Sequence, residues 1–287
     1  MSLSNGRSYL AIPGPSVIPD QVLQAMHRPS PNIYEGELIE ITESLIPDLK
    51  YVGQTDGYVA IYIANGHGAW EAALANMAEA GDTILVAATG SFAHGWAEIA
   101  ENMGIETQII EFGTHSPIDA GFIEEALRAD VHKKIKAVLV THVDTSSSVR
   151  NDVHSVRLAL DACHHPALLA ADCVASLACD TFEMDNWGVD IMVAGSQKGL
   201  MVPPGISFVY FNERAKIVQT SLSRVSSYWN WAPRIAPQLY YEYFCGTAPT
   251  QHIYGLRVAL DMIRNEGLEA IFARHEILAR AIWSAVE

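Results

Sequence analysis

Asp190-Ile-Met-Val-Ala-Gly-Ser-Gln-Lys198 is a run of apolar, partly β-branched residues that ends on a lysine. Its apolar centre is typical of a strand buried on both faces, as in a parallel sheet. A lysine at the end of such a strand loses its proton more readily than a solvated lysine, and the free amine can attack a carbonyl carbon. A lone lysine after a strand is more often a solvated loop residue, so Lys198 needs a partner before it indicates a site.

A carboxylate supplies that partner. Ala167-Leu-Leu-Ala-Ala-Asp172 has the same buried-strand pattern and ends on Asp172. Although an Asp in this position is often only a helix cap, two neighbouring parallel strands would bring Asp172 and Lys198 to one edge of the sheet, where open α/β sheets bind ligands. Pyridoxal phosphate requires this pair, a lysine for the Schiff base and a carboxylate that keeps the pyridine nitrogen protonated. The pair therefore predicts pyridoxal phosphate as cofactor.

The rest of the chain fits an α/β fold with a seven-stranded, mostly parallel sheet and helices on both faces. Apolar runs rich in β-branched residues alternate with amphipathic stretches, which is typical of that class. The last two strands are joined by a segment too short for a helical crossover, which favours an antiparallel seventh strand. The runs that predict strands are 58–64, 83–88, 107–112, 137–142, 167–172, 190–194 and 206–211. The stretches that predict helices are 69–79, 93–103, 120–131, 153–164, 253–265 and 268–286.

Composition excludes several functions. The net charge is −15, from 33 acidic and 18 basic residues without a basic cluster, so we expect no nucleic acid partner. No apolar run reaches the roughly 20 residues that span a bilayer, and the first residues do not resemble a signal peptide. Four cysteines and scattered histidines indicate neither disulfides nor a metal site. We therefore expect a soluble cytoplasmic protein without metal or membrane partners.

Three further segments follow predicted strands at their carboxyl ends. Asn65-Gly-His-Gly68 leads into a helix, whose N-terminal N–H groups are suited to a phosphate. Phe92 could stack on a pyridine ring, and Thr145-Ser-Ser-Ser148 offers hydroxyls for its phenolic oxygen. Each signal alone is as well explained by an ordinary turn, packing aromatic or loop, but together they favour one site. Neither a dinucleotide fingerprint, a P-loop nor the Gly-x-Ser-x-Gly elbow of a hydrolase occurs.

These motifs resemble the class V aminotransferases of fold type I, most of all the serine-glyoxylate and alanine-glyoxylate enzymes. The resemblance is carried by Asn65-Gly-His-Gly-Ala-Trp-Glu-Ala-Ala, Asp172-Cys-Val-Ala-Ser and Gly195-Ser-Gln-Lys-Gly-Leu-Met-Val-Pro-Pro-Gly205, within a match that begins near Pro13-Gly-Pro-Ser16. It implies that Lys198 forms the Schiff base and that Asp172 pairs with the ring nitrogen. It places Phe92 on the ring, Thr145 near the ring oxygen, and a phosphate-side group of Asn65, Gly66, His67 and Gln197. Thr247 resembles a phosphate contact that relatives donate from the other subunit, which implies a homodimer.

The resemblance also implies a reaction and a domain division. The reaction is ping-pong transfer of an amino group from serine or alanine to glyoxylate or a similar small 2-oxo acid. We expect a large cofactor-binding domain over 1–265 and the beginning of a C-terminal small domain over 266–287. In relatives the arginine that holds the substrate carboxylate lies in that small domain, most of which this chain lacks, so no residue here is assigned that role. This predicts either a truncated form or a changed function.

Alternative functions remain open at this point. Another class V activity, such as pyridoxamine-pyruvate transamination, would use the same scaffold. A cysteine desulfurase needs a mobile nucleophilic cysteine, whereas Cys163, Cys173 and Cys179 lie in helix or strand contexts. A non-catalytic homologue that only binds the cofactor is a further alternative, because the arginine is missing.

Overall fold

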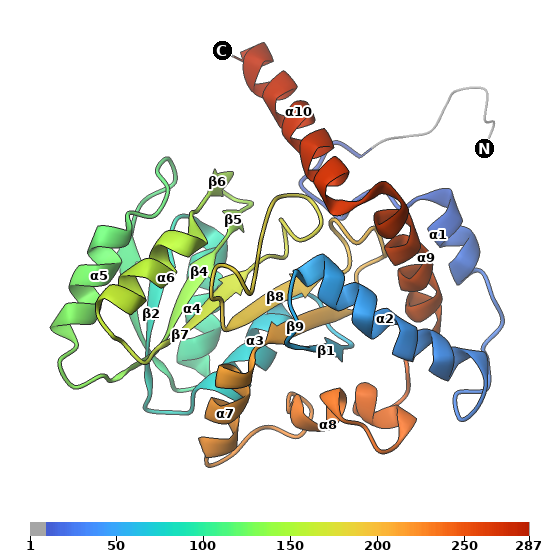
Figure 1. The fold of residues 1–287 in the computed structure, drawn as a ribbon, viewed down its shortest axis with the longest axis horizontal. Helices are drawn as coiled ribbons and strands as arrows, with labels where there is room; N and C mark the ends of the chain where they lie inside the picture. Colours follow the sequence, from blue (N-terminus) through green and yellow to red (C-terminus); the bar gives the residue numbers. More distant parts are fainter. Residues whose placement is uncertain (1–9, 287) are drawn as a thin grey trace.

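A seven-stranded mixed sheet forms the centre of the molecule, and a two-stranded hairpin lies beside it (Figure 1). The computed structural model describes residues 10–286. The strands of the large sheet are β1 (Tyr58–Tyr62), β2 (Thr83–Ala88), β3 (Glu106–Glu111), β4 (Ile135–Thr141), β7 (Leu168–Asp172), β8 (Ile191–Gly195) and β9 (Ser207–Phe211). The hairpin consists of β5 (Val143–Asp144) and β6 (Val149–Arg150).

The strand order is β1-β9-β8-β7-β4-β2-β3. Strands β8, β7, β4, β2 and β3 run parallel to one another, whereas β9 is antiparallel to both β8 and β1. The predicted antiparallel seventh strand is therefore confirmed. Because β8 and β9 are adjacent and opposed, the loop between them begins and ends at the same edge of the sheet, and this loop contains Lys198.

Helices cover both faces, and alternate residues of each strand point to opposite faces. Helices α3, α4 and α7 cover one face and α2, α5, α6 and α9 cover the other (Figure 1). On β2, Ile84 and Val86 belong to the core on the first face, whereas Leu85 and Ala87 belong to the core on the second. The helices are α1 (Asp20–Met26), α2 (Glu37–Gly53), α3 (Gly66–Met77), α4 (Ser91–Asn102), α5 (Ala120–Ala129), α6 (Val153–Ala162), α7 (Glu213–Ser221), α8 (Ala232–Ile235), α9 (Thr250–Glu266) and α10 (Leu268–Val286), with a 3-10 turn at Tyr240–Tyr243.

The helices and strands of the structure differ from the predicted ones in their number and in their ends. The helix expected over 69–79 begins earlier, at Gly66, because the Asn65 side chain caps it by accepting a hydrogen bond from the Gly68 N–H (3.2 Å). Helices α1, α2, α7 and α8 were not predicted. Most strand ends differ from the predicted ones by one or two residues, as is usual at frayed ends.

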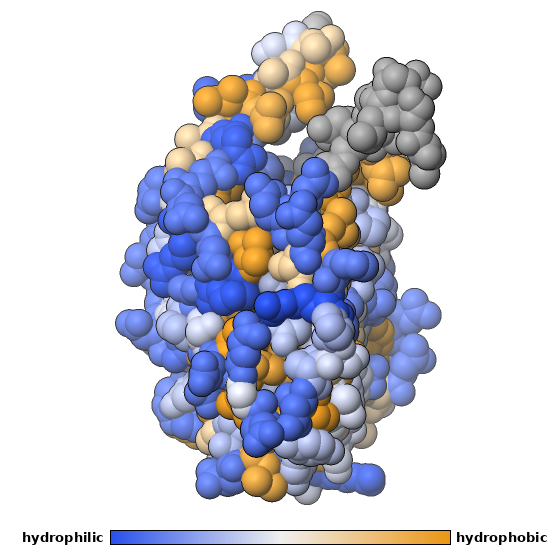
Figure 2. Space-filling view, turned by 90° about the vertical axis from the view of Figure 1, so that its right-hand side faces the viewer, coloured by the Kyte–Doolittle hydropathy of each residue, from blue (hydrophilic) through white to orange (hydrophobic). Residues whose placement is uncertain are grey.

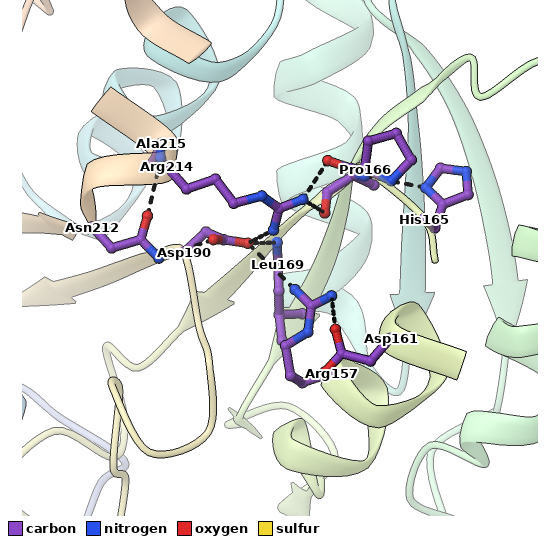
Figure 3. Close-up of polar contacts among 10 residues, drawn as sticks. Arg157, Asp161, His165, Pro166, Leu169, Asp190, Asn212, Arg214 and Ala215 are labelled. Atoms are coloured by element: carbon purple, nitrogen blue, oxygen red, sulfur yellow. Dashed lines mark hydrogen bonds and ion pairs between the residues drawn. The ribbon is translucent and has the colours of Figure 1, made fainter. Parts of the chain in front are cut away.

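At the amino ends of the central strands, buried Asp190 joins β7, β8 and the start of α7 (Figure 3). Its carboxylate accepts hydrogen bonds from the Leu169 N–H (2.8 Å), Asn212 Nδ2 (2.9 Å) and Arg214 (2.8 Å). Arg157 lies 3.7 Å away on α6. Arg214 also donates to the backbone carbonyl of Ala167 (2.9 Å), so this network fixes the strands at the edge opposite Lys198.

Replacing Asp190 by asparagine should lower the free energy of unfolding by about 1.5 to 3 kcal/mol, because two arginines lose the carboxylate that neutralises them. Urea unfolding of the variant would measure this loss. The matched control is Asp161→Asn, since exposed Asp161 forms a surface pair with Arg157 (2.6 Å) that contributes little. Equal stability of the two variants would contradict a stabilising role for the Asp190 network.

Helix α10 projects from the body of the molecule (Figure 1), and its apolar side chains gather at the top of Figure 2. Leu268 and Ile271 at its beginning are buried, whereas the later apolar residues are exposed, Trp283 by 54%. The other exposed apolar residues of the helix are Ile277, Leu278, Ile282 and Val286. Even so, no helix within residues 10–286 has the length and apolar character needed to cross a membrane.

Candidate functional site

A cavity of about 270 Å³ lies at the carboxyl ends of the parallel strands. It brings together eight of the nine residues that the sequence predicted for the site, namely Asn65, Gly66, His67, Phe92, Thr145, Asp172, Gln197 and Lys198. The ninth, Thr247, is exposed and does not line this cavity. The structure therefore brings these predicted residues together at one edge of the sheet.

Asp172 is the last residue of β7 and is only 4% exposed. Its carboxylate accepts hydrogen bonds from Trp70 Nε1 (3.1 Å) and from the Val174 N–H (2.8 Å). Burial raises the pKa of Asp172 to about 6, although these two hydrogen bonds favour the charged form. The carboxylate thus lies in a dry setting, where a cationic partner would be strongly favoured.

The raised pKa of Asp172 has a consequence for stability. A carboxyl whose folded-state pKa exceeds its unfolded value stabilises the fold below the unfolded pKa, and this stabilisation is lost as the pH rises through about 6. Asp172→Asn removes that titration. In cofactor-free protein, the unfolding free energy of the variant relative to wild type should rise by up to about 3 kcal/mol between pH 4 and pH 7.

Urea unfolding of both proteins over this pH range measures the difference. Asp56→Asn is the control, because it makes the same change of side chain at an exposed position. A difference for Asp172→Asn that stays constant with pH would show that Asp172 is not a buried carboxyl of raised pKa.

Lys198 lies in the loop after β8 and is partly buried. Its Nζ donates a hydrogen bond to the backbone carbonyl of Pro13. Burial lowers the pKa of Lys198, while the nearby Cys179 and the Asp172 carboxylate act in the opposite sense. The lowered pKa increases the fraction of free amine at neutral pH, which is the form that attacks a carbonyl carbon.

Trp70 is a cavity residue that sequence reasoning did not assign to the site. It donates to Asp172, and its ring contacts those of His67 (4.5 Å between centroids) and Phe92 (6.1 Å) and stacks on Trp96 (6.0 Å). Trp70 follows Gly66 by four residues on α3, and therefore lies on the same helix face. That spacing is the signal from which it could have been predicted.

Asp144 was also missed. This buried residue ends β5 and accepts hydrogen bonds from the N–H groups of Phe92 (3.1 Å) and Ala93 (3.2 Å) at the start of α4. It also accepts from Ser146 Oγ (2.6 Å). Asp144 thereby fixes the backbone of Phe92 and the hairpin turn that carries Thr145 to the same cavity.

The part of the cavity lined by the N-terminus of α3 is suited to an anionic group. The N-terminus of α3 points its free N–H groups there, and the Asn65 side chain is fixed as the cap. The amide oxygen of Gln197 is buried and has no hydrogen-bond partner among the described residues. That oxygen is an acceptor and needs a donor from a ligand, whereas the N–H groups at the start of α3 are donors that fit the phosphate of a phosphorylated ligand.

Two arginines that could hold a substrate carboxylate are already engaged. Arg234 is 1% exposed and donates to the backbone carbonyls of Ile61 (2.8 Å), Tyr228 (2.6 Å) and Tyr243 (3.0 Å). Arg150 pairs with Asp180 (3.0 Å) in a neighbouring cavity.

A third arginine lines a cavity together with Lys198. Arg274 lines a cavity of about 670 Å³ to which Lys198 also contributes, and it pairs with Glu266 (2.6 Å).

Comparison with known proteins identifies the family. The family model described as aminotransferase class-V matches residues 8–287. The chain is 39% identical to serine-glyoxylate aminotransferase of Methylorubrum extorquens, over 98% of this chain and 71% of that protein. It is 34% identical to the serine-glyoxylate aminotransferase of Arabidopsis thaliana, again over 98% of this chain and 71% of the relative. The crystal structure of alanine-glyoxylate aminotransferase from Nostoc sp. superimposes with a TM-score of 0.87, at 25% identity over 99% of this chain and 77% of that one.

The chain therefore belongs to the class V aminotransferase family. Its fold is that of the fold type I aminotransferases, as expected from the sequence. Membership of this family implies pyridoxal phosphate as the cofactor and amino transfer as the class of reaction.

Proposed function

We propose that this chain moves an amino group from serine or alanine to glyoxylate, or to a similar small 2-oxo acid, with pyridoxal phosphate as cofactor. The observation that carries the proposal is that Lys198 and Asp172 line the same cavity. Three relatives at 34 to 39% identity are serine-glyoxylate aminotransferases and a fourth, at 35%, is an L-aspartate-glyoxylate aminotransferase, which supports glyoxylate as acceptor.

In this proposal the cofactor, when bound, supplies an electron sink that stabilises negative charge on the substrate Cα. Asp172 is positioned to neutralise a protonated ring nitrogen, and Trp70 and Val174 keep its carboxylate oriented. Phe92 provides an aromatic face and Thr145 a hydroxyl. The phosphate side consists of Asn65, Gly66, His67 and Gln197.

Lys198 has two roles in the proposal. It holds the cofactor covalently in the resting state, and after the amino donor displaces it, the free amine removes the proton from the substrate Cα. Both roles need an uncharged amine, which the burial-lowered pKa of Lys198 favours. The same amine would deliver that proton to carbon C4′ of the cofactor, and in the second half-reaction would move a proton from C4′ to the Cα of the acceptor.

Cysteine desulfuration is disfavoured by the thiols near the site. Burial raises the pKa of Cys179 to about 11 and raises the pKa of Cys173 well above its ordinary value. Neither side chain therefore supplies the reactive thiolate that sulfur abstraction requires. Pyridoxamine-pyruvate transamination and a non-catalytic homologue are the alternatives that the test below separates.

Absorbance of the purified protein with pyridoxal phosphate, followed by mixing with L-serine, tests the proposal. A visible band that shifts with L-serine or L-alanine and returns with glyoxylate is the expected result. Addition of L-cysteine should release no sulfide. Failure to bind the cofactor, or a band that no amino acid moves, would contradict the proposed function. A response to pyridoxamine and pyruvate alone would support that alternative activity.

We also propose a homodimer in which Thr247 contacts the phosphate of the partner's site. Thr247 is exposed and lies outside the cavity of its own chain. It ends the segment 226–247, which is rich in aromatic residues and has exposed apolar side chains such as Leu239 and Tyr241. Thr247→Val should weaken cofactor retention by a factor of ten at most, through the loss of one hydrogen bond. Equilibrium dialysis measures the retention, and Thr220→Val is the control because the Thr220 hydroxyl bonds within its own helix (2.7 Å).

The mass of the protein by light scattering provides the second test of the dimer. A monomer that binds the cofactor at full strength would contradict it.

We further propose that residues 1–265 form the cofactor-binding domain and that 266–287 begin a small domain, because Gly267 separates α9 from the projecting α10. A cytoplasmic location fits the four free cysteines.

A further inference from the structure

The segment Pro13–Ser16 lies against the loop between β8 and β9 that contains Lys198. The Ser16 N–H donates to the carbonyl of Gln197 (2.8 Å). The Ser16 hydroxyl lies within hydrogen-bonding distance of the carbonyls of Gln197 (3.1 Å) and Lys198 (2.9 Å). Two segments that are 181 residues apart in the sequence are thus joined next to Lys198.

Within this segment, Gly14 lies directly against the Lys198 side chain. A Cβ added to Gly14 would lie 2.6 Å from Lys198 Nζ and 2.8 Å from its Cε, closer than real contacts allow. Gly14 also has φ of +122°, which side chains rarely adopt. Only a residue without a side chain permits this approach, and the neighbouring carbonyl of Pro13 accepts a hydrogen bond from Lys198 Nζ.

Gly14 and Lys198 lie in the wall between two cavities. Both residues line the 270 Å³ cavity with Asp172, and both line the 670 Å³ cavity, to which Pro13 and Ser16 also contribute. The position of the amine relative to the two cavities therefore depends on where the Pro13 carbonyl lies. That carbonyl is in turn fixed through Ser16.

We propose that Pro13–Ser16 is a positioning segment for Lys198, in which the Pro13 carbonyl holds the free amine and the Ser16 side chain keeps that carbonyl in place. The segment acts on the amine when it is not covalently engaged. The assignment of a catalytic effect rests on the proposed function, whereas the contact itself can be tested in protein without cofactor.

Ser16→Ala tests the contact in cofactor-free protein. Limited reductive methylation with formaldehyde and a borane, followed by peptide mass analysis, reports how accessible each lysine amine is. Loss of the Ser16 hydroxyl should increase the labelling rate of Lys198 by about five-fold, the effect of one lost hydrogen bond. Lys216, whose amine is bound to Tyr58 (2.9 Å) and not to Pro13, should label at the wild-type rate in the same sample.

Two further variants make the result specific. Ser16→Thr keeps a hydroxyl and should restore slow labelling of Lys198. Gly14→Ala should speed the labelling independently, because its methyl group displaces the amine from the Pro13 carbonyl. Ser221→Ala is the matched control, since the Ser221 hydroxyl bonds only to the Val218 carbonyl of its own helix (2.7 Å). Wild-type labelling of Lys198 in both Ser16→Ala and Gly14→Ala would overturn the proposal.

The catalytic arm uses the protein loaded with pyridoxal phosphate. Ser16→Ala should slow the half-reaction with L-serine by about five-fold while the affinity for the cofactor changes little, because the covalent bond holds Lys198 in the resting state. Equal losses of cofactor affinity and half-reaction rate would contradict a role limited to the free amine. If the protein binds no pyridoxal phosphate, the proposed function fails, and the labelling of Lys198 still decides the role of the segment.

Discussion

Replacing Lys198 by alanine should abolish amino transfer, with kcat lower by on the order of 10⁴ or more. The variant loses both the covalent attachment of the cofactor and the amine that moves the substrate proton. The rate at which L-serine and glyoxylate give glycine measures the effect. Lys216→Ala is the control, because Lys216 is bound at the surface to Tyr58 and Glu213 and should leave the rate unchanged.

Borohydride reduction provides a direct test of the same assignment. After reduction of the loaded protein, peptide mass analysis should find the cofactor on Lys198. An adduct on Lys216 or another lysine would show that the site has been assigned to the wrong residue. The Lys198→Ala variant should give no adduct at all.

Asp172→Asn should slow removal of the Cα proton by on the order of 10² to 10³, while cofactor binding stays measurable. An amide cannot neutralise a protonated ring nitrogen, so the electron sink is weakened. In addition, the Trp70 Nε1–H and the Val174 N–H both donate to Asp172 in the native chain. In the variant, the NH₂ group of the amide must face one of these two donors.

Stopped-flow measurement of the half-reaction with L-serine, using substrate deuterated at Cα, isolates this step. The variant should show a larger isotope effect, since proton removal then limits the rate more fully. Asp56→Asn, at an exposed position, serves as the control. An unchanged half-reaction rate in Asp172→Asn would remove Asp172 from the mechanism.

The sheet was predictable from the sequence for a physical reason. Strands buried on both faces, such as β2, β4 and β8, are continuous apolar runs, and this pattern survives any detail of packing. Helix α2 escaped prediction although Leu38, Leu45 and Leu49 have helical spacing, because Pro47 within it is normally a helix breaker. The short helices α1 and α8 depend on tertiary contacts more than on local pattern.

The candidate site was predictable only in part. Lys198 and Asp172 were found because each lies at or just beyond the carboxyl end of a strand, so that topology alone places them together. Gly14 and Asp144 were not found, because their roles depend on segments distant in sequence, the Lys198 loop and the start of α4. Pairings of that kind leave no periodic signal in a single chain.

The position of β1 at the edge of the sheet affects how the chain is made. Its sheet neighbour, β9, is the last strand of the sheet to be synthesised. Strand β1 therefore cannot pair until the ribosome has synthesised the chain as far as Phe211. During that time Val59, Ala60 and Ile61 are an unpaired apolar strand. Expression should therefore depend on chaperones that shield nascent strands, and variants that weaken β9 should aggregate before they lose cofactor.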